Sequence, residues 1–299
     1  MKKITAHEVA ARLPKRAPTA HKGNFGRVLV VAGSREMCGA GLLCALGALR
    51  AGAGLTAWVL PKSMQPAFAA ALPEVITVPA AETKDGLLSA NAQDDLIRFC
   101  ARFQPTLLAC GPGLRESPLL SFILQETNLP LVLDADGLNF LAAHPKVSLV
   151  GRPCICTPHP GELARLLKSP VAADPKARVQ QAQLWSQQTG AVAVLKGNKT
   201  LVAFSDEIWE NTTGSVALAK GGSGDVLTGV IAGLWAQLSA AGGFTNQSAL
   251  SAALSGVYLH GLAGDLAAKE LTAYGVLARD VANRISTAFK KVIATRSVQ

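Results

Sequence analysis

The feature of this sequence that most constrains its fold is a repeated order, in which a short apolar run is followed by a polar or glycine-rich turn and then by a helical pattern. The apolar runs show no polar alternation, which is typical of strands covered on both faces. Polar groups follow four of these runs directly, at residues 111–113, 134–139, 157–162 and 196–200. The order predicts an α/β fold with a mostly parallel central sheet and helices on both faces, in which ligands bind at the carboxyl ends of the strands.

Size and composition indicate one well-buried domain. Apolar residues make up 49% of the 299 residues, charged residues 16% and aromatic residues 5%, and the 28 glycines favour close packing through small side chains. Because no linker or internal repeat divides the chain, we predict a single domain over residues 1–299, with residues 1–20 as a lead-in. No apolar run reaches the ~18–20 residues of a membrane span, and the N-terminus lacks the apolar core of a signal peptide. We therefore expect a soluble, cytoplasmic protein with no membrane partner.

Charge and cysteine usage exclude two further classes of partner. The net charge is +9, but the basic residues are scattered and form no stripe with interleaved aromatic residues, so no nucleic-acid partner is expected. A small anionic substrate fits this charge better. The six cysteines include no CxxC pair and no zinc-ligand spacing. We predict buried, reduced thiols at Cys38, Cys44, Cys100, Cys110, Cys154 and Cys156.

Local signals place individual elements. Ser117 is predicted to cap a helix whose first residue is Pro118. Residues 130–141 are predicted as a buried strand ending in acidic residues, and residues 198–211 as a hairpin. Three helices are expected to finish the chain, the first of them directly after Asp225.

A glycine-rich turn, Lys220 to Asp225 (KGGSGD), leads into that helix. The first N–H groups of a helix lack intrahelical partners and lie at the positive end of the helix dipole, so such a turn attracts phosphate. The phosphate would repel the carboxylate of Asp225, which indicates a task beyond binding, namely taking a proton from a hydroxyl that attacks phosphorus. The alternative is structural, because the dipole also favours Asp in a first turn and glycines also form tight turns.

Other nucleotide and nucleophile motifs are absent from the sequence. No GxxxxGK[ST] occurs, the run after Gly39 lacks the third glycine of GxGxxG, and no GxSxG is present. A P-loop enzyme, a dinucleotide Rossmann enzyme and a serine hydrolase of the GxSxG type are therefore disfavoured.

The ordered set HKGNFGRVLVVAGS, ACGPGL, LVLDADGLN, TPHPGELARLL, VLKGNKT and LAKGGSGDVLTG resembles the ADP-dependent (S)-NAD(P)H-hydrate dehydratases of the ribokinase-like superfamily, from about Leu13 to about Ile285. The resemblance implies a ribokinase-like fold and a lyase that repairs hydrated NADH or NADPH. In that reaction a phosphoryl group from ADP turns the ring hydroxyl into phosphate, which the ring nitrogen expels, leaving AMP.

The resemblance also implies roles for individual residues. Asp225 would be the catalytic base. The amides of Gly222, Ser223 and Gly224 would form an anion hole for the transferred phosphoryl group. The hydrated nicotinamide would bind at Ala40, Gly113, His159 and Asp225, and the adenine nucleotide at Lys196, Gly197, Asn198, Lys199, Thr200 and Gly224.

Metal and histidine assignments follow in the same way. Glu162 comes three residues after His159, as in the NxxE pattern of related sugar kinases, and would hold Mg²⁺ through water; a first-turn helix carboxylate is the alternative. Asp134 and Asp136 are alternative metal or substrate contacts. His260 is expected to be a core histidine.

Two other functions stay open at this point. One is a ribokinase-like kinase of a vitamin precursor or sugar alcohol, which TPHPGE in place of NxxE argues against. The other is a nucleotide-binding scaffold, which would need no base beside its anion hole. The sequence leaves open ADP against ATP and NADH hydrate against NADPH hydrate. The family implies a homotetramer, and we expect no epimerase domain.

Overall fold

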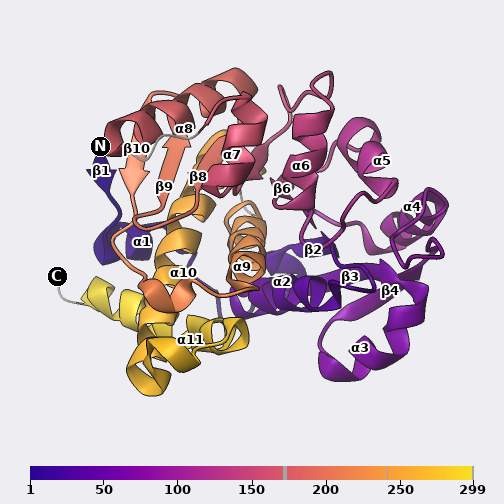
Figure 1. The fold of residues 1–299 in the computed structure, drawn as a ribbon. Coiled ribbons are helices and arrows are strands. Elements are labelled where there is room, and N and C mark those ends of the chain that lie inside the picture. Colours follow the sequence, from indigo (N-terminus) through magenta and orange to yellow (C-terminus); the bar gives the residue numbers. More distant parts are fainter. Residues whose placement is uncertain (171–173, 241, 298–299) are drawn as a thin grey trace.

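The computed structural model describes residues 1–170, 174–240 and 242–297. Within these ranges the strands are β1 (Lys2–Lys3), β2 (Arg27–Val31), β3 (Leu55–Pro61), β4 (Ile76–Ala80), β5 (Leu107–Cys110), β6 (Leu131–Leu133), β7 (Cys154–Cys156), β8 (Val192–Leu195), β9 (Leu201–Phe204) and β10 (Glu207–Glu210). They form one sheet in the order β1-β10-β9-β8-β7-β6-β5-β2-β3-β4 (Figure 1).

The sheet is mostly parallel, as predicted. From β4 across to β8 every neighbouring pair runs parallel, and only the β8–β9 and β9–β10 pairs are antiparallel. The latter two pairs include the predicted hairpin, in which Leu201 pairs with Glu210. Because β2 and β5 to β8 point the same way, the turns that follow them lie along one edge of the sheet.

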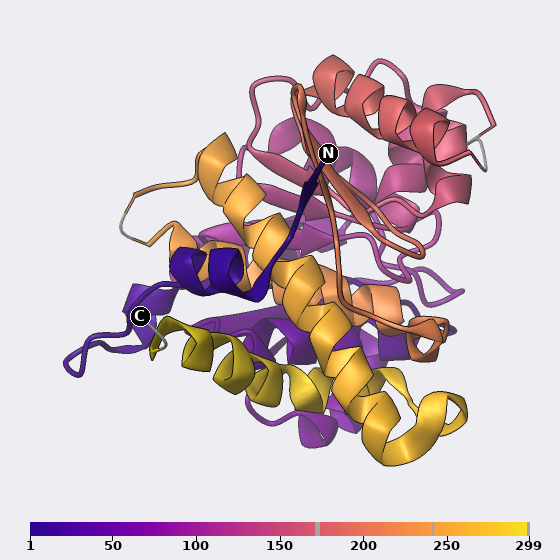
Figure 2. The same ribbon diagram turned by 90° about the vertical axis from the view of Figure 1, so that its left-hand side faces the viewer.

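Helices cover both faces (Figures 1 and 2). They are α1 (Ala6–Arg12), α2 (Cys38–Arg50), α3 (Gln65–Ala71), α4 (Ala92–Phe103), α5 (Leu119–Glu126), α6 (Asp136–Ala143), α7 (Pro160–Leu167), α8 (Pro175–Thr189), α9 (Ser223–Leu238), α10 (Asn246–Gly275) and α11 (Ala278–Ala294), with short 3₁₀ turns at Lys22–Phe25, Lys62–Met64, Val216–Leu218 and Thr295–Ser297.

Alternate residues of the central strand enter different cores. Val28 and Val30 of β2 pack in the core that contains residues of α1, α2, α9, α10 and α11. Leu29 and Val31 pack in the core on the other face, with residues of α4 to α8. A strand buried on both faces is thus apolar at every position, which is why the sequence shows no alternation there.

Helices α2 and α9 touch backbone to backbone. A Cβ atom on Gly229 would lie 1.9 Å from the carbonyl oxygen of Cys44, and one on Gly47 would lie 2.5 Å from the carbonyl oxygen of Val226. Larger side chains at these positions would force the helices apart. This contact between two helices fixes the start of α9 relative to α2 through small residues.

Two local predictions were wrong. Residues 136–143 form helix α6, and only 131–133 are strand, because Ala135 adopts φ 48°, ψ −115° and turns the chain. Helix α5 begins at Leu119 with Pro118 as its cap residue. The buried hydroxyl of Ser117 donates to the carbonyl of Leu88 at 2.7 Å and accepts from the amide of Leu119 at 3.3 Å, so it joins the start of α5 to another segment.

No helix in the three described ranges has both the length and the apolar composition needed to cross a membrane.

Candidate functional site

The glycine-rich turn ends at the first residue of α9. Gly222 is the N-cap with φ 87°, a left-handed conformation that favours glycine, and Ser223, Gly224 and Asp225 form the first turn. The Ser223 amide donates weakly to the carbonyl of Lys220 at 3.3 Å. The amides of Gly224 and Asp225 donate to no group in the described part of the chain. The turn therefore presents amides without a partner among the described residues, that of Asp225 included, and the predicted anion hole stays a prediction.

Lys196 brings the end of β8 to this turn. A Cβ atom on Gly224 would lie 3.5 Å from Lys196 Nζ, so the ammonium sits beside the first turn of α9. Its Nζ donates to Asp134 Oδ1 at 2.6 Å and lies 3.8 Å from Glu162 Oε2. Burial lowers the pKa of Lys196, but the two carboxylates outweigh that effect and the pKa is raised overall. Lys196 therefore stays charged next to the anion-binding amides.

Asp134 joins the end of β6 to α9. Its side chain is buried, with Oδ2 accepting a hydrogen bond from the hydroxyl of Thr228 at 2.7 Å. The sequence predicts Asp134 only as an alternative metal or substrate contact, and it predicts no role for Thr228. A threonine in an otherwise apolar buried helix was the available signal, because a buried hydroxyl needs a partner.

His159 and Glu162 form a capping box at the start of α7. Nδ1 of His159 accepts from the amides of Gly161 (3.0 Å) and Glu162 (3.4 Å), and the His159 amide donates to Glu162 Oε2 at 2.7 Å. Glu162 Oε1 lies 3.3 Å from Nε2 of the same imidazole. Burial raises the pKa of Glu162 against the pull of Lys196. Both oxygens of Glu162 thus have protein neighbours, while half of the His159 side chain faces solvent.

The residues expected to bind the nicotinamide side meet at the start of α2. A Cβ atom on Gly113 (φ 65°) would lie 2.9 Å from the Cβ atoms of both Ala40 and Met37. One turn further along α2, a Cβ atom on Gly222 would lie 2.5 Å from Cδ1 of Leu43. Helix α2 therefore connects the Gly113 turn to the glycine-rich turn before α9.

The turn from Gly197 to Thr200 joins β8 to β9. Its residues up to Lys199 are exposed, and Gly197 (φ 145°) and Lys199 (φ 55°) have positive φ. The Thr200 hydroxyl donates to the Gly197 carbonyl at 3.1 Å, which closes the turn. The predicted nucleotide-binding segment therefore begins beside Gly224 and continues to the surface.

Asp225 differs from the other carboxylates of the cluster. It is half-buried and makes no hydrogen bond or ion pair with any described residue. Burial and the charge of Asp134 raise its pKa to about 6, Lys196 opposes this, and Asp136 adds to it. A carboxylate with this pKa is ionised at neutral pH and is a stronger base than an ordinary aspartate.

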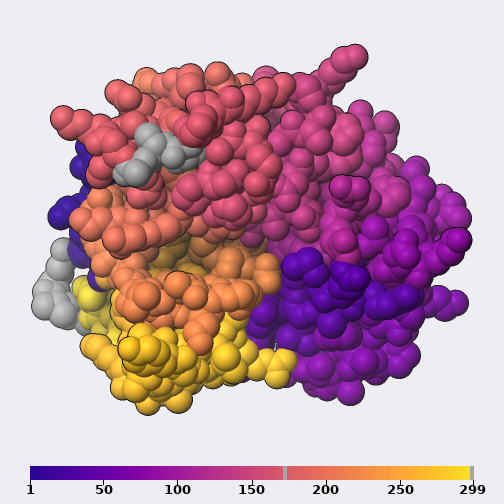
Figure 3. Space-filling view, viewed as in Figure 1, coloured from indigo at the N-terminus to yellow at the C-terminus, as the bar shows by residue number. Residues whose placement is uncertain are grey.

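The segments that form the cluster come from distant parts of the chain. In the space-filling view of Figure 3, the N-terminal, middle and C-terminal thirds border one another on one face. The residues proposed from the sequence either contact one another in series or lie in segments next to residues that do. These are glycine-rich turns and strand ends that meet at the carboxyl edge of the sheet.

A family model described as NAD(P)H-hydrate dehydratase matches residues 28–287. The chain belongs to the NAD(P)H-hydrate dehydratase family.

Curated relatives of this dehydratase family member fall into two length classes. The ADP-dependent (S)-NAD(P)H-hydrate dehydratase of Bacillus subtilis is 35% identical over 96% of this chain and 97% of its own length. The bifunctional NAD(P)H-hydrate repair enzyme of Moorella thermoacetica is 41% identical over 93% of this chain but only 52% of its own length. The chain thus spans about half the length of the bifunctional relatives.

Solved structures show the same fold. A ribokinase-like superfamily protein of Enterococcus faecalis has a TM-score of 0.81 at 26% identity, covering 98% of this chain and 96% of that one. An ADP/ATP-dependent NAD(P)H-hydrate dehydratase of Bacillus subtilis, co-crystallised with ATP/Mg²⁺, has a TM-score of 0.77 at 32% identity, covering 97% and 98%. The predicted ribokinase-like fold is confirmed.

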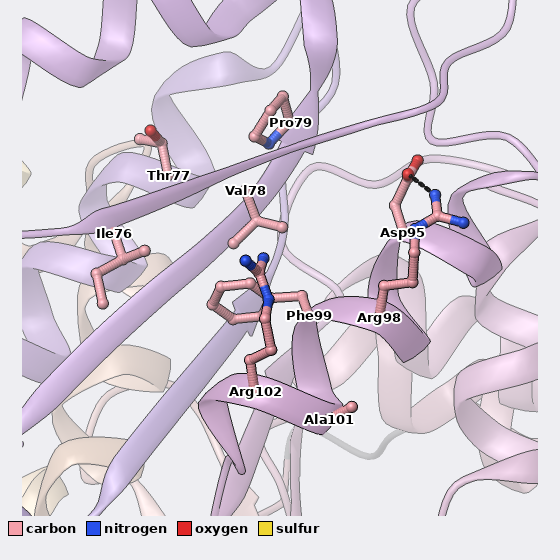
Figure 4. A pocket seen from close by; sticks show the side chains of 9 residues that line it. All are labelled: Ile76, Thr77, Val78, Pro79, Asp95, Arg98, Phe99, Ala101 and Arg102. Atoms are coloured by element: carbon pink, nitrogen blue, oxygen red, sulfur yellow. Dashed lines mark hydrogen bonds and ion pairs between the residues drawn. The ribbon is translucent and has the colours of Figure 1, made fainter.

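A separate pocket of the dehydratase family member lies between β4 and α4 (Figure 4). It measures about 740 Å³ and is lined by apolar side chains such as Val78 and Phe99, with Arg102 and the Asp95–Arg98 ion pair at its rim. No residue proposed from the sequence for catalysis or binding lines this pocket.

Metal-binding groups are sparse. The described ranges contain no group of three or more His, Cys, Asp or Glu side chains placed to hold a metal ion. Mg²⁺ usually binds through one or two carboxylates together with substrate phosphates. The unpartnered Asp225 and the nearby Glu162 supply oxygen donors of that kind, so the site fits a metal that arrives with a nucleotide.

Proposed function

We propose that the protein catalyses the ADP-dependent dehydration of (S)-NAD(P)H hydrate to NAD(P)H, with formation of AMP and phosphate. The observation that carries this proposal is the position of Asp225, a carboxylate with no hydrogen-bond or ion-pair partner among the described residues. It lies in the first turn of α9, beside amides that are free to bind an anion and near the ammonium of Lys196. A base at an anion-binding turn suits transfer of a phosphoryl group to a hydroxyl.

The first step moves a proton and a phosphoryl group. Asp225 accepts the proton of the ring hydroxyl, whose oxygen then forms a bond to the terminal phosphorus of ADP as the bond to AMP breaks. The free amides of Gly224 and Asp225 would stabilise charge on the transferred group, as would those predicted at Gly222 and Ser223. Lys196 would stabilise the same charge from the end of β8.

The second step restores the ring. The carbon–oxygen bond breaks with its electron pair going to phosphate, which the ring nitrogen's electron pair assists, and the neighbouring carbon loses a proton. Phosphate is a far better leaving group than hydroxide, which explains how a site of kinase type serves a lyase. The balance is hydrate plus ADP giving NAD(P)H, AMP and phosphate.

The proposed nicotinamide site lies where Gly113 contacts the start of α2. Ala40, Gly113 and His159 would line the pocket for the hydrated nicotinamide together with Asp225. The close approach of Gly113 to Ala40 supports this, because it brings these two segments of the proposed site together. Lys196 to Thr200 and Gly224 would hold the adenine nucleotide.

We propose that Mg²⁺ binds together with the phosphates of the nucleotide. Three carboxylates, those of Asp134, Glu162 and Asp225, lie near the ammonium of Lys196, so a bound diphosphate would add to an excess of negative charge. A divalent cation bound to the phosphates offsets that excess. Glu162 would hold it through water, because both of its oxygens already have protein neighbours.

The test is incubation of the purified protein with (S)-NADH hydrate or (S)-NADPH hydrate and either ADP or ATP, with Mg²⁺. We expect the absorbance of the reduced nicotinamide to return and AMP and phosphate to form from ADP in equal amounts. A stable phosphorylated product that accumulates without restored absorbance would identify a kinase instead. Comparing the nucleotides and hydrates sets the preferences that the sequence leaves open.

We also propose that the protein is a cytoplasmic homotetramer. The family resemblance supports this assembly, and light scattering of the purified protein measures it directly.

A further inference from the structure

We propose that Asp136 and Asn139 are positioning residues, which set the place of the Gly113 turn (residues 111–115) relative to the helix that carries His159. This inference rests on the proposed function, in which Gly113 and His159 line the site for the hydrated nicotinamide. A series of hydrogen bonds supports it, running from the turn after β5 through α6 to α7. The sequence predicts Asp136 only as an alternative metal or substrate contact.

The backbone of the Gly113 turn needs support from outside the turn. Gly111 (φ 123°) and Gly113 (φ 65°) have positive φ, and so does Arg115 (φ 55°), a conformation that costs free energy for a residue with a side chain. The Pro112 carbonyl accepts from the Gly33 amide at 2.7 Å, which ties the first part of the turn to the end of β2. The last part of the turn, where Arg115 lies, needs a partner of its own.

Asp136 supplies that partner from the first residue of α6. Its Oδ2 accepts from the Arg115 amide at 2.7 Å, and its Oδ1 accepts from Asn139 Nδ2 at 3.2 Å. The backbone turn at Ala135 (φ 48°, ψ −115°) directs Asp136 to this side, whereas Asp134 bonds to α9. Both oxygens of Asp136 thus accept from protein donors, as expected of a group that positions the backbone.

Asn139 continues the series to α7. Its Oδ1 accepts from Arg165 Nε at 3.0 Å, while its Nδ2 donates to Asp136. Arg165 belongs to α7, whose cap residue is His159. The side-chain amide of Asn139 has one orientation that satisfies both partners, because exchanging its oxygen and nitrogen would put donor against donor and acceptor against acceptor. Three hydrogen bonds in series therefore connect the Gly113 turn to the helix that carries His159.

An ion pair extends the series towards α2. Arg115 pairs with Glu36, which precedes α2 and its residue Ala40. The side chains of Arg115 and Glu36 are 50% and 69% exposed, so solvent screens the pair and it contributes little. Asp136 and Asn139 are half-buried. We therefore assign the positioning role to these two residues.

The expected consequence concerns binding of the hydrate and not of ADP. None of the three hydrogen bonds reaches the predicted nucleotide segment, Lys196 to Thr200, or the glycine-rich turn before α9. A changed distance between Gly113 and His159 would alter the fit of the ring equally in the ground state and in the transition state. A loss of that kind raises KM and leaves kcat unchanged.

The experiment is steady-state kinetics with (S)-NADH hydrate as the varied substrate, at saturating ADP with Mg²⁺. We expect Asp136→Ala to raise KM for the hydrate about tenfold, with kcat and the Kd of ADP within about twofold of the wild type. Asp136→Ala removes both the bond to Arg115 and the link to α7. A KM within about twofold of the wild type would overturn the proposal.

Two conservative variants separate hydrogen bonding from charge. Asp136→Asn keeps an oxygen acceptor for the Arg115 amide but turns a donor towards Asn139, so it loses only the link to α7. Asn139→Ala loses the same link, and each variant should raise KM about threefold. Asp136→Asn as impaired as Asp136→Ala would show that the charge of Asp136 matters, as for a metal ligand, and the proposal would be wrong.

The matched control is Asp95→Ala. Asp95 of α4 accepts from the Ala81 amide at 2.8 Å and from the Arg98 side chain at 2.6 Å. It thus repeats the bonds of Asp136, one to an amide outside its helix and one to the side chain three residues further on. Asp95→Ala should lower the melting temperature about as much as Asp136→Ala and leave KM unchanged. An equal rise in KM in both would show a general effect of destabilisation and contradict the assignment.

A double variant tests whether the bonds act in series. Asp136→Ala already breaks the link through Asn139, so adding Asn139→Ala should raise KM no further. Losses that multiply would show two independent effects and contradict the series. If Asp136→Ala does not fold, Asp136→Asn and Asn139→Ala carry the test, and a wild-type KM in both would overturn the proposal.

Failure of the proposed function is distinguishable from failure of this inference. Turnover by the wild type with the same KM in all variants would leave the function standing and overturn only the positioning role. If the wild type turns over no hydrate with either nucleotide, the proposed function is wrong, and binding of the hydrate is measured by calorimetry instead. A Kd that rises in Asp136→Ala, and less in Asp136→Asn, would uphold the positioning role. Equal Kd values, or no binding of hydrate by the wild type, would overturn it.

Discussion

The Cα–H of Gly113 faces the methyl group of Ala40 so closely that a Cβ atom on Gly113 would lie 2.9 Å from it. Gly113 lies in the segment after β5 and Ala40 in the first turn of α2, and together with Met37 they form one wall of the proposed nicotinamide site. We expect Gly113→Ala to raise KM for the hydrate at least about tenfold, because the added methyl group and the positive φ of 65° displace this wall.

The matched control for that variant is Gly190→Ala. Gly190 also has positive φ, 71°, but no atom lies within 4 Å of the position of its Cβ. It carries a similar backbone penalty far from any ligand contact. Equal effects of the two variants on KM would show that backbone strain, and not the wall, explains the result.

Replacing the proposed base gives the most direct test of mechanism. Asp225→Asn should lower the rate of AMP formation by about 10²–10⁴-fold, the usual contribution of a general base. Binding of ADP, measured by calorimetry, should change little because the anion-binding amides remain. Unchanged turnover would remove Asp225 from the mechanism.

The pH profile of the wild type follows from the same residue. Because the pKa of Asp225 is raised to about 6, its protonated fraction grows as the pH falls through 6. A protonated carboxylate cannot accept the hydroxyl proton, so kcat/KM should be about tenfold below its plateau at pH 5. An acid limb near pH 4 would indicate a carboxylate that the surroundings do not perturb.

Stability should respond to Asp225 in the opposite direction from activity. Its folded-state pKa of about 6 exceeds the ordinary value of 3.8, so the folded protein binds this proton more tightly than the unfolded chain does. The resulting stability is complete below pH 3.8 and is lost as the pH rises through 6. Asp225→Asn should therefore melt about 2–4 °C above the wild type at pH 8 and level with it near pH 4, by differential scanning fluorimetry.

The α2–α9 contact makes a prediction about packing alone. Gly229→Ala places a methyl group 1.9 Å from the carbonyl oxygen of Cys44, so we expect a loss of about 1–3 kcal/mol or more in the free energy of unfolding. Gly242→Ala, whose Cβ would meet no atom within 4 Å, should leave stability nearly unchanged. Denaturant titration of both variants measures the difference.

Much of the site could be predicted from the sequence because its parts are local. Lys196 is predicted from an apolar run that ends in a polar group. The Gly222–Asp225 turn is predicted from glycines that precede a helix. In a parallel sheet these ends necessarily meet at one edge. That argument places the residues near one another without knowledge of their side-chain contacts.

The choice between Asp134 and Asp136 could not be read in the same way. Asp134 follows the last residue of β6 by one position and Asp136 by three, and the backbone turn at Ala135 decides which one faces α9. That conformation depends on the Gly111 turn, which is distant in sequence. Helix α6 was missed for a related reason, since its first residues continue an apolar run that reads as strand.

The sequence predicts one of the two roles considered for Glu162. A carboxylate three residues after a cap position is the pattern of a capping box, but histidine is an unusual cap residue. Whether Glu162 also holds a metal through water depends on the nucleotide and stays a prediction.

Because the backbones of α2 and α9 are in direct contact, Ala40 near the start of α2 and Asp225 near the start of α9 belong to a single stiff unit. Their separation cannot be tuned by exchanging one side chain for another, since no side chain lies between the two helices at Gly229 and Gly47. Acceptance of a smaller or larger ring alcohol would have to evolve in the turns that face this unit, such as the one that carries Gly113.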